Sequence, residues 1–235
     1  MLPRVPIEPT PTGIVFPDPR DAVEGIVAVG EDFRPGTLLT AYRSGIFPWP
    51  HGKSNKQVLW FSPEERMIFP LDGSVTPSRR MRATLRSHPY RITTNQAFLE
   101  VAKACGNERE QGTWITPQLL AGYAQLHELG WAESLEVWDE RGPERALIGG
   151  IYGVKIGGLF AGESMFHRVK DASKIAFYEM ARRLAARGFV LFDAQVYNDH
   201  LDSLGCYEIP RDEYLQRLRD ALPVQVKPDA TPDLA

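Results

Sequence analysis

The sequence has few cysteines, no long apolar run and no strong excess of either charge. Its 235 residues include two cysteines, too few for a disulfide framework or a cysteine-rich zinc site. No apolar stretch approaches the roughly 20 residues that cross a bilayer, and no charged segment followed by an apolar one indicates a secretory signal. The net charge of −3 excludes a uniformly basic surface but allows a local basic patch. These absences predict a cytoplasmic protein with reduced thiols and no membrane partner.

Several catalytic motifs are also missing. The chain has neither the G-x-x-x-x-G-K-[ST] loop that holds phosphates nor the G-x-G-x-x-G turn that holds dinucleotides. Neither cysteine has an activating partner at a meaningful spacing. The run Asn198-Asp199-His200 contains metal-binding residue types, but no second cluster of ligands accompanies it. The sequence therefore predicts no metal site.

The composition is that of a globular protein, with 43% hydrophobic and 24% charged residues. Six of the first nineteen residues are prolines, which favours an extended arm because proline removes backbone donors. Two aromatic runs braced by proline follow and form either a small core or a stacking platform: Phe47-Pro48-Trp49-Pro50 and Trp60-Phe61-Ser62-Pro63. A boundary at the second run predicts a small N-terminal domain (1–62), a second domain (63–223) and a frayed tail (224–235).

Apolar periodicity and turn signals predict a regular order of elements in the second half of the chain. Strands are expected over 134–139, 146–155, 159–166, 189–196 and 207–209, and helices over 173–187, 199–204 and 211–222. Antiparallel hairpins that lead into one long helix favour an α+β or mixed α/β fold. The order is similar to that of the CoA-dependent N-acetyltransferases (the GNAT-like fold). The segment 167–173 has no glycine, unlike the turn that holds the CoA pyrophosphate in that fold, so CoA is not expected as the acyl donor.

The segment 66–91 is strongly basic, with six arginines, one acidic residue and a net charge of +5. Arg79, Arg82 and Arg86 share one face of a helix that is expected to begin near Ser78. A solvated helical face explains most charge runs. A face built only for solubility usually mixes charges of both signs, however, so phosphate binding is an equal alternative.

Three polar residues stand in strands that are otherwise apolar. Asp193 and Gln195 are two apart, which places both side chains on one strand face, together with Leu191. They either face solvent at a sheet edge or orient an amine nucleophile and polarise a carbonyl. Glu163 follows apolar and small residues and must be paired with an arginine or used in chemistry.

Five apolar residues from neighbouring elements form a second candidate set. They form either part of the core or the lining of a hole for a large apolar side chain, to which methionine adapts well. The set comprises Phe160, Met165, Phe177, Met180 and Phe192.

Five phrases of the sequence occur in a characteristic order: Phe47-Pro48-Trp49, Leu59-Trp60-Phe61-Ser62-Pro63, Gly112-Thr113-Trp114-Ile115-Thr116, Gly162-Glu163-Ser164-Met165-Phe166 and Asp193-Ala194-Gln195-Val196-Tyr197-Asn198-Asp199-His200. Shorter phrases link them: Leu126-His127-Glu128-Leu129-Gly130, Ser203-Leu204-Gly205 and Ile209-Pro210-Arg211. From about Phe16 to Leu222 the chain thereby resembles the leucyl/phenylalanyl-tRNA–protein transferases.

The resemblance implies a cytoplasmic aminoacyltransferase that moves Leu, Phe or Met from its tRNA to a protein whose N-terminus is Arg or Lys. This transfer marks the acceptor protein for degradation through the bacterial N-end rule. The resemblance also implies a small N-terminal domain, a C-terminal domain of acetyltransferase-like fold, and no metal or other cofactor.

The resemblance also implies roles for individual residues. It makes Asp193 and Gln195 the catalytic pair, with Glu163 beside them. The aminoacyl side chain would be surrounded by Ile151, Phe160, Met165, Phe177, Met180 and Phe192. Trp49 and Trp114 would contact the 3′ end of the tRNA, and the acceptor-stem backbone would contact Arg79, Arg80, Arg82 and Arg86.

Asp193 is then expected to take or orient the proton of the attacking amine, while Gln195 holds Asp193 or the ester carbonyl. Proton sharing with the ribose hydroxyls of the tRNA is the alternative. Two other functions also fit the residues: a small-molecule acyltransferase of the same fold, and an RNA-binding module without catalytic activity.

Overall fold

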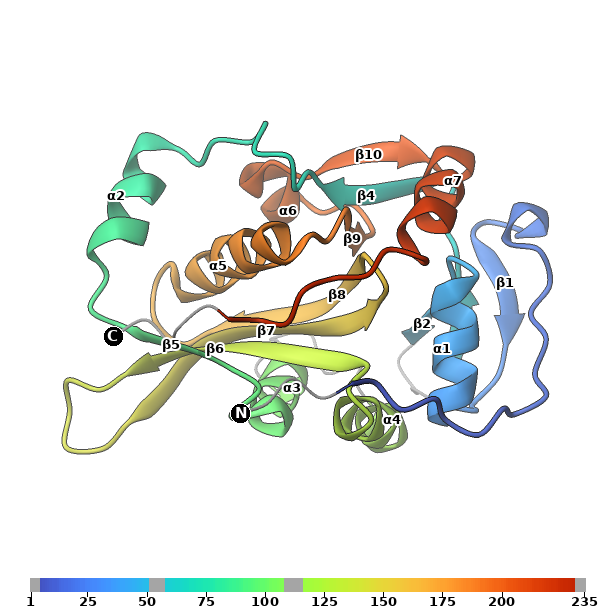
Figure 1. The fold of residues 1–235 in the computed structure, drawn as a ribbon, viewed down its shortest axis with the longest axis horizontal. Helices are drawn as coiled ribbons and strands as arrows, with labels where there is room; N and C mark the ends of the chain where they lie inside the picture. Colours follow the sequence, from blue (N-terminus) through green and yellow to red (C-terminus); the bar gives the residue numbers. More distant parts are fainter. Residues whose placement is uncertain (1–4, 51–57, 108–115, 231–235) are drawn as a thin grey trace.

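The computed structural model describes residues 5–50, 58–107 and 116–230, which form two β-sheets and their covering helices (Figure 1). The strands are β1 (Ile26–Val29), β2 (Phe47–Pro50), β3 (Val58–Phe61), β4 (Glu65–Phe69), β5 (Arg91–Thr94), β6 (Ala132–Asp139), β7 (Ala146–Ile156), β8 (Leu159–His167), β9 (Leu191–Gln195) and β10 (Tyr207–Pro210). The helices are the short 3₁₀ helix η1 (Pro19–Asp21), α1 (Pro35–Arg43), α2 (Arg79–Ser87), α3 (Phe98–Asn107), α4 (Pro117–Glu128), α5 (Ala172–Arg187), α6 (Asp199–Leu204) and α7 (Arg211–Ala221).

Local sequence signals explain where several helices begin and end. Ser78 caps α2 by accepting a hydrogen bond from the amide of Met81, as the sequence predicts. Thr116 caps α4 in the same way, with proline as the first helical residue. Helix α5 ends at Gly188, whose φ of 88° lies in the left-handed region that glycine adopts freely.

The larger sheet has seven strands in the order β10-β4-β9-β8-β7-β6-β5, and its pairs are antiparallel except for β8 and β9. A parallel pair needs a crossover connection, and α5 provides it. Helix α5 covers one face of the sheet, against β6, β7 and β8, while α3 and α4 cover the opposite face (Figure 1). Helix α7 packs against β4, β9 and β10. This arrangement confirms the mixed α/β class and the predicted order of elements from β6 to α7.

The smaller sheet, in the order β1-β3-β2, uses residues 26–61 alone. Its edge strand β2 contains Pro48 and Pro50, which is where a strand tolerates the loss of backbone donors. One core cluster includes Leu38 and Phe47 from this part and Val101 and Tyr123 from the rest of the chain. The change from one sheet to the other falls at residues 62–64, and the division into domains 1–62 and 63–223 stays a prediction.

The C-terminal segment differs from the prediction of a frayed tail. Over 224–230 it is extended and docked: the amide of Lys227 donates to the carbonyl of Arg187 at 2.8 Å, and Asp229 pairs with the buried Arg183 at 3.2 Å. Val226 packs against the core beneath α5. The polar composition of the segment gave no sign of these contacts, because their partners, Arg183 and Arg187, belong to a helix far away in the sequence. Residues 231–235 lie outside the described part.

Candidate active site

Two β-bulges place the polar residues of the candidate site. The register between β7 and β8 shifts by one residue, which leaves Glu163 as an extra residue on β8. A similar shift between β4 and β9 makes Ala194 the extra residue between Asp193 and Gln195. Gln195 has a φ of 67°, a left-handed conformation that is uncommon outside glycine and that clusters at functional sites. The bulge interrupts the strict alternation of side chains between the two faces of this strand, which the sequence suggested.

Glu163 is the centre of a buried hydrogen-bonded cluster. The hydroxyls of Tyr42 and Tyr123 donate to its Oε1 and Oε2 at 2.7 and 2.5 Å, and the side-chain amide of Gln195 donates to Oε1 at 2.8 Å. Burial raises the pKa of Glu163 to about 7; the tyrosine hydrogen bonds oppose this rise, and the charge of Asp193 adds to it. Among the described residues Glu163 has no ion pair with an arginine, so the salt-bridge alternative is not what this structure shows.

Asp193 is fully buried and has different partners. Arg66 donates from Nε to Oδ1 at 2.8 Å and from Nη2 to Oδ2 at 2.6 Å, a bidentate ion pair. The hydroxyl of Tyr214 donates to Oδ2 at 2.8 Å, and the backbone amide of Gln195 donates to Oδ1 at 2.9 Å. Asp193 therefore contacts the backbone of Gln195, while the side chain of Gln195 extends to Glu163.

The structure thus brings all three predicted catalytic residues into one network and adds four that the sequence did not indicate. Arg66, Tyr42, Tyr123 and Tyr214 come from β4, α1, α4 and α7, far apart along the chain. Arg66 belongs to the predicted basic segment, yet its side chain is 1% exposed and takes no part in a basic surface.

Comparison with known proteins shows the family of this chain. A family described as "Leucyl/phenylalanyl-tRNA protein transferase" matches residues 68–219, and its N-terminal domain matches residues 31–64. The chain belongs to the leucyl/phenylalanyl-tRNA–protein transferase family. Its relatives of that name include one from Pseudoalteromonas atlantica, 44% identical and covering 88% of both chains. Another from Shewanella baltica is 46% identical and covers 87% of this chain and 86% of its own.

A solved structure has a similar fold. The crystal structure of FemX matches with a TM-score of 0.51 and 14% identity, over 74% of this chain and 66% of the other. At this identity the likeness concerns the fold alone.

The apolar residues predicted around the aminoacyl side chain lie together where α5 packs against the sheet. Phe177 and Phe192 stack with ring centroids 5.1 Å apart, and Phe192 meets Phe160 edge-on at 5.2 Å. Ile151 and Met180 belong to the same buried cluster, and Met165 packs against it half-buried. This neighbourhood suits both interpretations, a core and the lining of an aminoacyl pocket in a transferase of this family.

Of the two tryptophans predicted to contact tRNA, the structure describes Trp49 alone. Trp49 is half-buried on β2, with its ring 6.0 Å from those of Phe47 and Phe61. It therefore lies in the aromatic cluster of the small sheet, and its contact with tRNA stays a prediction. Trp114 lies outside the described residues.

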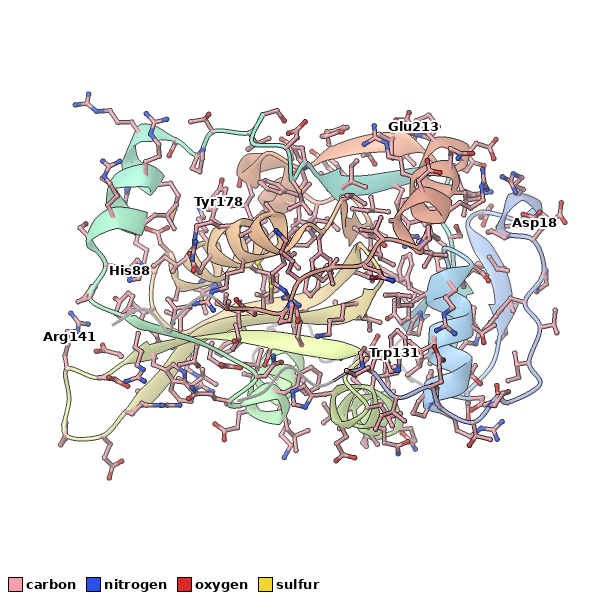
Figure 2. All side chains as sticks on the ribbon, viewed as in Figure 1. Asp18, His88, Trp131, Arg141, Tyr178 and Glu213 are labelled. Carbon is pink, nitrogen blue, oxygen red and sulfur yellow. The ribbon has the colours of Figure 1, made fainter. Side chains whose placement is uncertain are left out.

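The predicted basic helix is present as α2, at the end of the molecule opposite α1 (Figure 1). Arg79, Arg80, Arg82 and Arg86 are all exposed, and none forms an ion pair with a described residue. Figure 2 shows side chains with nitrogen tips pointing outward from this helix. Unpaired exposed arginines agree better with an anionic partner than with a face of mixed charge.

Proposed function

We propose that this protein transfers leucine, phenylalanine or methionine from aminoacyl-tRNA to the N-terminal Arg or Lys of acceptor proteins, which marks them for degradation by the bacterial N-end rule. The observation that carries the proposal is the buried network of Glu163, Gln195 and Asp193. It lies within the stretch that matches the transferase family and joins two neighbouring strands through bulges. We further propose that the protein works in the cytoplasm, where tRNA and nascent acceptors are present.

The chemistry needs positioning more than bond activation. The α-amine of the acceptor attacks the ester carbonyl of the aminoacyl-tRNA. A peptide bond forms, the ester C–O bond breaks, and the ribose oxygen leaves with a proton. An N-terminal amine has a pKa near ~8, so a useful neutral fraction exists at neutral pH. Holding amine and ester together therefore supplies much of the rate.

Within this reaction we propose that Glu163 takes the proton of the attacking amine. Asp193 already accepts two hydrogen bonds on each oxygen, two of them from Arg66. Glu163 accepts three in all, two on Oε1 and one on Oε2, so one of its roughly four acceptor sites is left for a proton. Glu163 has a pKa of about 7, near the pH at which a general base is most effective. Gln195, which donates to Glu163, has a carbonyl oxygen that orients the amine. The role of Asp193 is then to hold this arrangement.

A GNAT-like classification remains part of the proposal. It is supported by the parallel β8–β9 pair joined by α5 and by the likeness to FemX. The turn before α5 has a left-handed residue at Asp171 and no glycine, unlike a turn that cradles a pyrophosphate with backbone amides. This favours an aminoacyl-tRNA donor over CoA.

The deciding experiment is incubation with labelled Leu-tRNA or Phe-tRNA and a protein that begins with Arg. The matched acceptor begins with Ala and is otherwise identical. Label transferred only to the Arg acceptor is expected. Absence of product with intact tRNA binding would instead indicate an RNA-binding module, and detectable CoA binding would indicate a small-molecule acyltransferase.

Removing three charges from α2 should weaken tRNA binding without regard to sequence. Each lost phosphate contact flattens the plot of log affinity against log salt by roughly 0.7 to 0.9. Changing Arg79, Arg80 and Arg82 to Ala should therefore lower the affinity for several tRNAs alike and reduce the slope by about 2 to 3.

The control triple variant changes Arg20, Arg34 and Arg219, exposed arginines outside α2, to Ala. It alters the net charge by the same amount and should leave the slope unchanged. Equal effects of both variants would contradict a specific role for α2.

Opening the apolar cluster at Phe177 should change the preference among donors. A missing methylene contact is worth about 1–3 kcal/mol, so Phe177→Ala should change the ratio of kcat/KM for Leu- and Phe-tRNA by about 10- to 200-fold. The control Leu184→Ala truncates a fully buried side chain of the same helix and cluster. It should lower the melting temperature and reduce the activity with both donors equally. The same behaviour in Phe177→Ala would favour the core interpretation.

A further inference from the structure

Arg66 is a buried charge on the strand next to one edge of the seven-stranded sheet. It lies on β4, between β9 and β10, and its side chain is 1% exposed. The guanidinium carbon lies over the rings of both Phe47 and Tyr214, 4.4 and 4.3 Å from their centroids. Its Nη1 donates to the carbonyl of Gly45 at 3.2 Å. The aromatic faces and the carbonyl fix the plane of the guanidinium before Asp193 is considered.

The fixed plane of the Arg66 guanidinium determines how the Asp193 carboxylate is oriented and which hydrogen bonds it accepts. The carboxylate accepts two hydrogen bonds from Arg66, one from Tyr214 and one from the backbone of Gln195, two on each oxygen. An ionised carboxylate has about four acceptor sites, so no site is left for a proton from substrate. Burial would lower the pKa of Arg66, but the charge of Asp193 raises it, so the guanidinium stays charged.

The pair also controls the conformation of Gln195. Its φ of 67° is strained for a residue with a side chain, and such strain persists only where the surroundings over-determine it. The surroundings here are the hydrogen bond from its amide to Asp193 Oδ1 and the bond from its side chain to Glu163. If Asp193 moved, Gln195 could relax and its side chain would leave Glu163.

We propose that Arg66 is a positioning residue, which holds Asp193 as a fixed carboxylate so that Gln195 keeps its strained backbone and presents its side chain beside Glu163. This inference rests on the proposed function and deepens it, because it assigns a positioning role to a residue next to the proposed reacting groups. Arg66 also connects that site to the N-terminal segment, since it contacts Gly45 and Phe47, which lie four and two residues before Trp49.

A purely structural ion pair is the competing account. Buried ion pairs add little stability compared with apolar residues of the same size, so stability alone is a weak reason for one here. Only the positioning account predicts that replacing Arg66 lowers turnover because Asp193 is displaced, and therefore that it has little further effect once Asp193 is replaced. A double-mutant cycle separates the two accounts.

The experiment measures single-turnover rates, KM for Leu-tRNA and melting temperatures for Arg66→Lys, Asp193→Asn and the double variant. Lysine keeps the charge but cannot make the bidentate, stacked contact. Arg66→Lys should lower the rate by about 10- to 100-fold, the range that a small misplacement of reacting groups can cost, with KM changed less than threefold. The double variant should be no more than threefold slower than the slower single variant. Losses that multiply across the two positions would overturn the proposal.

Two further variants keep the result decisive. Arg183→Lys alters another 1%-exposed arginine, paired with Glu179 and Asp229 away from the site, and should lower stability with an unchanged rate. Tyr214→Phe keeps the ring on Arg66 and removes the hydroxyl, which donates to Asp193 and accepts from Arg66 Nη2 at 3.3 Å. It should fold and lose about 3- to 10-fold in rate. Wild-type rates in both Arg66→Lys and Tyr214→Phe would overturn the proposal.

The same variants separate this inference from the proposed function. An inactive wild-type protein contradicts the proposed function. The positioning role is then tested by a crystal structure of Arg66→Lys. Relaxation of Gln195 from its left-handed φ, with its side chain away from Glu163, supports the positioning role, and the wild-type geometry overturns it.

Discussion

Replacing Glu163 by glutamine is expected to slow aminoacyl transfer by about 10²- to 10⁴-fold, the contribution typical of a general base. Glutamine keeps the size of the side chain but cannot take a proton at neutral pH. In the wild type the rate should rise with pH through about 7, because the ionised form of Glu163 is the base. In Glu163→Gln the part of this rise centred near 7 should disappear, and only the rise through about 8, where the acceptor amine loses its proton, should remain. Single-turnover rates with Leu-tRNA between pH 5.5 and about 8.5 measure both effects.

The same residue makes a prediction about stability. The pKa of Glu163 is raised from 4.5 to about 7 on folding, so the folded state binds this proton more tightly than the unfolded chain. Stability present at low pH is therefore lost as the pH rises from about 4.5 to about 7, by about 3 kcal/mol. Glu163→Gln should lack this loss in denaturant unfolding at several pH values.

A second buried glutamate provides the control. Burial would raise the pKa of Glu133 on β6, but Lys155 and Arg187 lower it to about 2. Glu133→Gln should reduce stability because it leaves two cations without their partner, yet it should keep the pH dependence of transfer. A wild-type rate in Glu163→Gln would exclude Glu163 as the base and favour proton transfer through the ribose hydroxyls.

The parts of the fold that the sequence predicted have their signals within a few residues. Ser78, Thr116 and Gly188 begin or end helices through contacts in the adjacent turn. Helix α3 was not predicted because the amides just before it, those of Gln96 and Ala97, donate to Glu136 of the distant strand β6. Strand β2 was not predicted because its prolines favour a loop, and only its place at a sheet edge accommodates them.

Part of the site was predictable too, because its signals also lie within a few residues of each other in the sequence. Glu163, Asp193 and Gln195 are conspicuous as polar residues in apolar strands, and the structure joins them in one network. The sequence could not show the two bulges, because a change of register depends on pairing between strands rather than on either strand alone. Tyr42 and Arg66 were missed because their patterns match a helical core position and a basic surface segment. Tertiary contacts alone reveal their partners.

Replacing Asp193 by asparagine is expected to have a large effect on both rate and stability. The change in volume is small, but it leaves Arg66 as a buried charge without its partner, which typically costs about 3–5 kcal/mol. Turnover should fall by about 10²- to 10⁴-fold as Gln195 loses its anchor, while KM for aminoacyl-tRNA changes little. The variant should be assayed well below its melting temperature, and Arg66→Met/Asp193→Asn should recover stability without recovering the rate.

The pH profile of Asp193→Asn decides which carboxylate takes the proton. Asp193 raises the pKa of Glu163, and the variant both removes that anion and leaves Arg66 unpaired nearby. Both changes favour the ionised form of Glu163, while Tyr42 and Tyr123 stay neutral because burial raises their pKa values well above 10. If Glu163 is the base, the residual activity should keep its dependence on pH, with the rise moved below 7. If Asp193 is the base, as the sequence first suggested, only the rise through about 8 that belongs to the acceptor amine should remain in the variant.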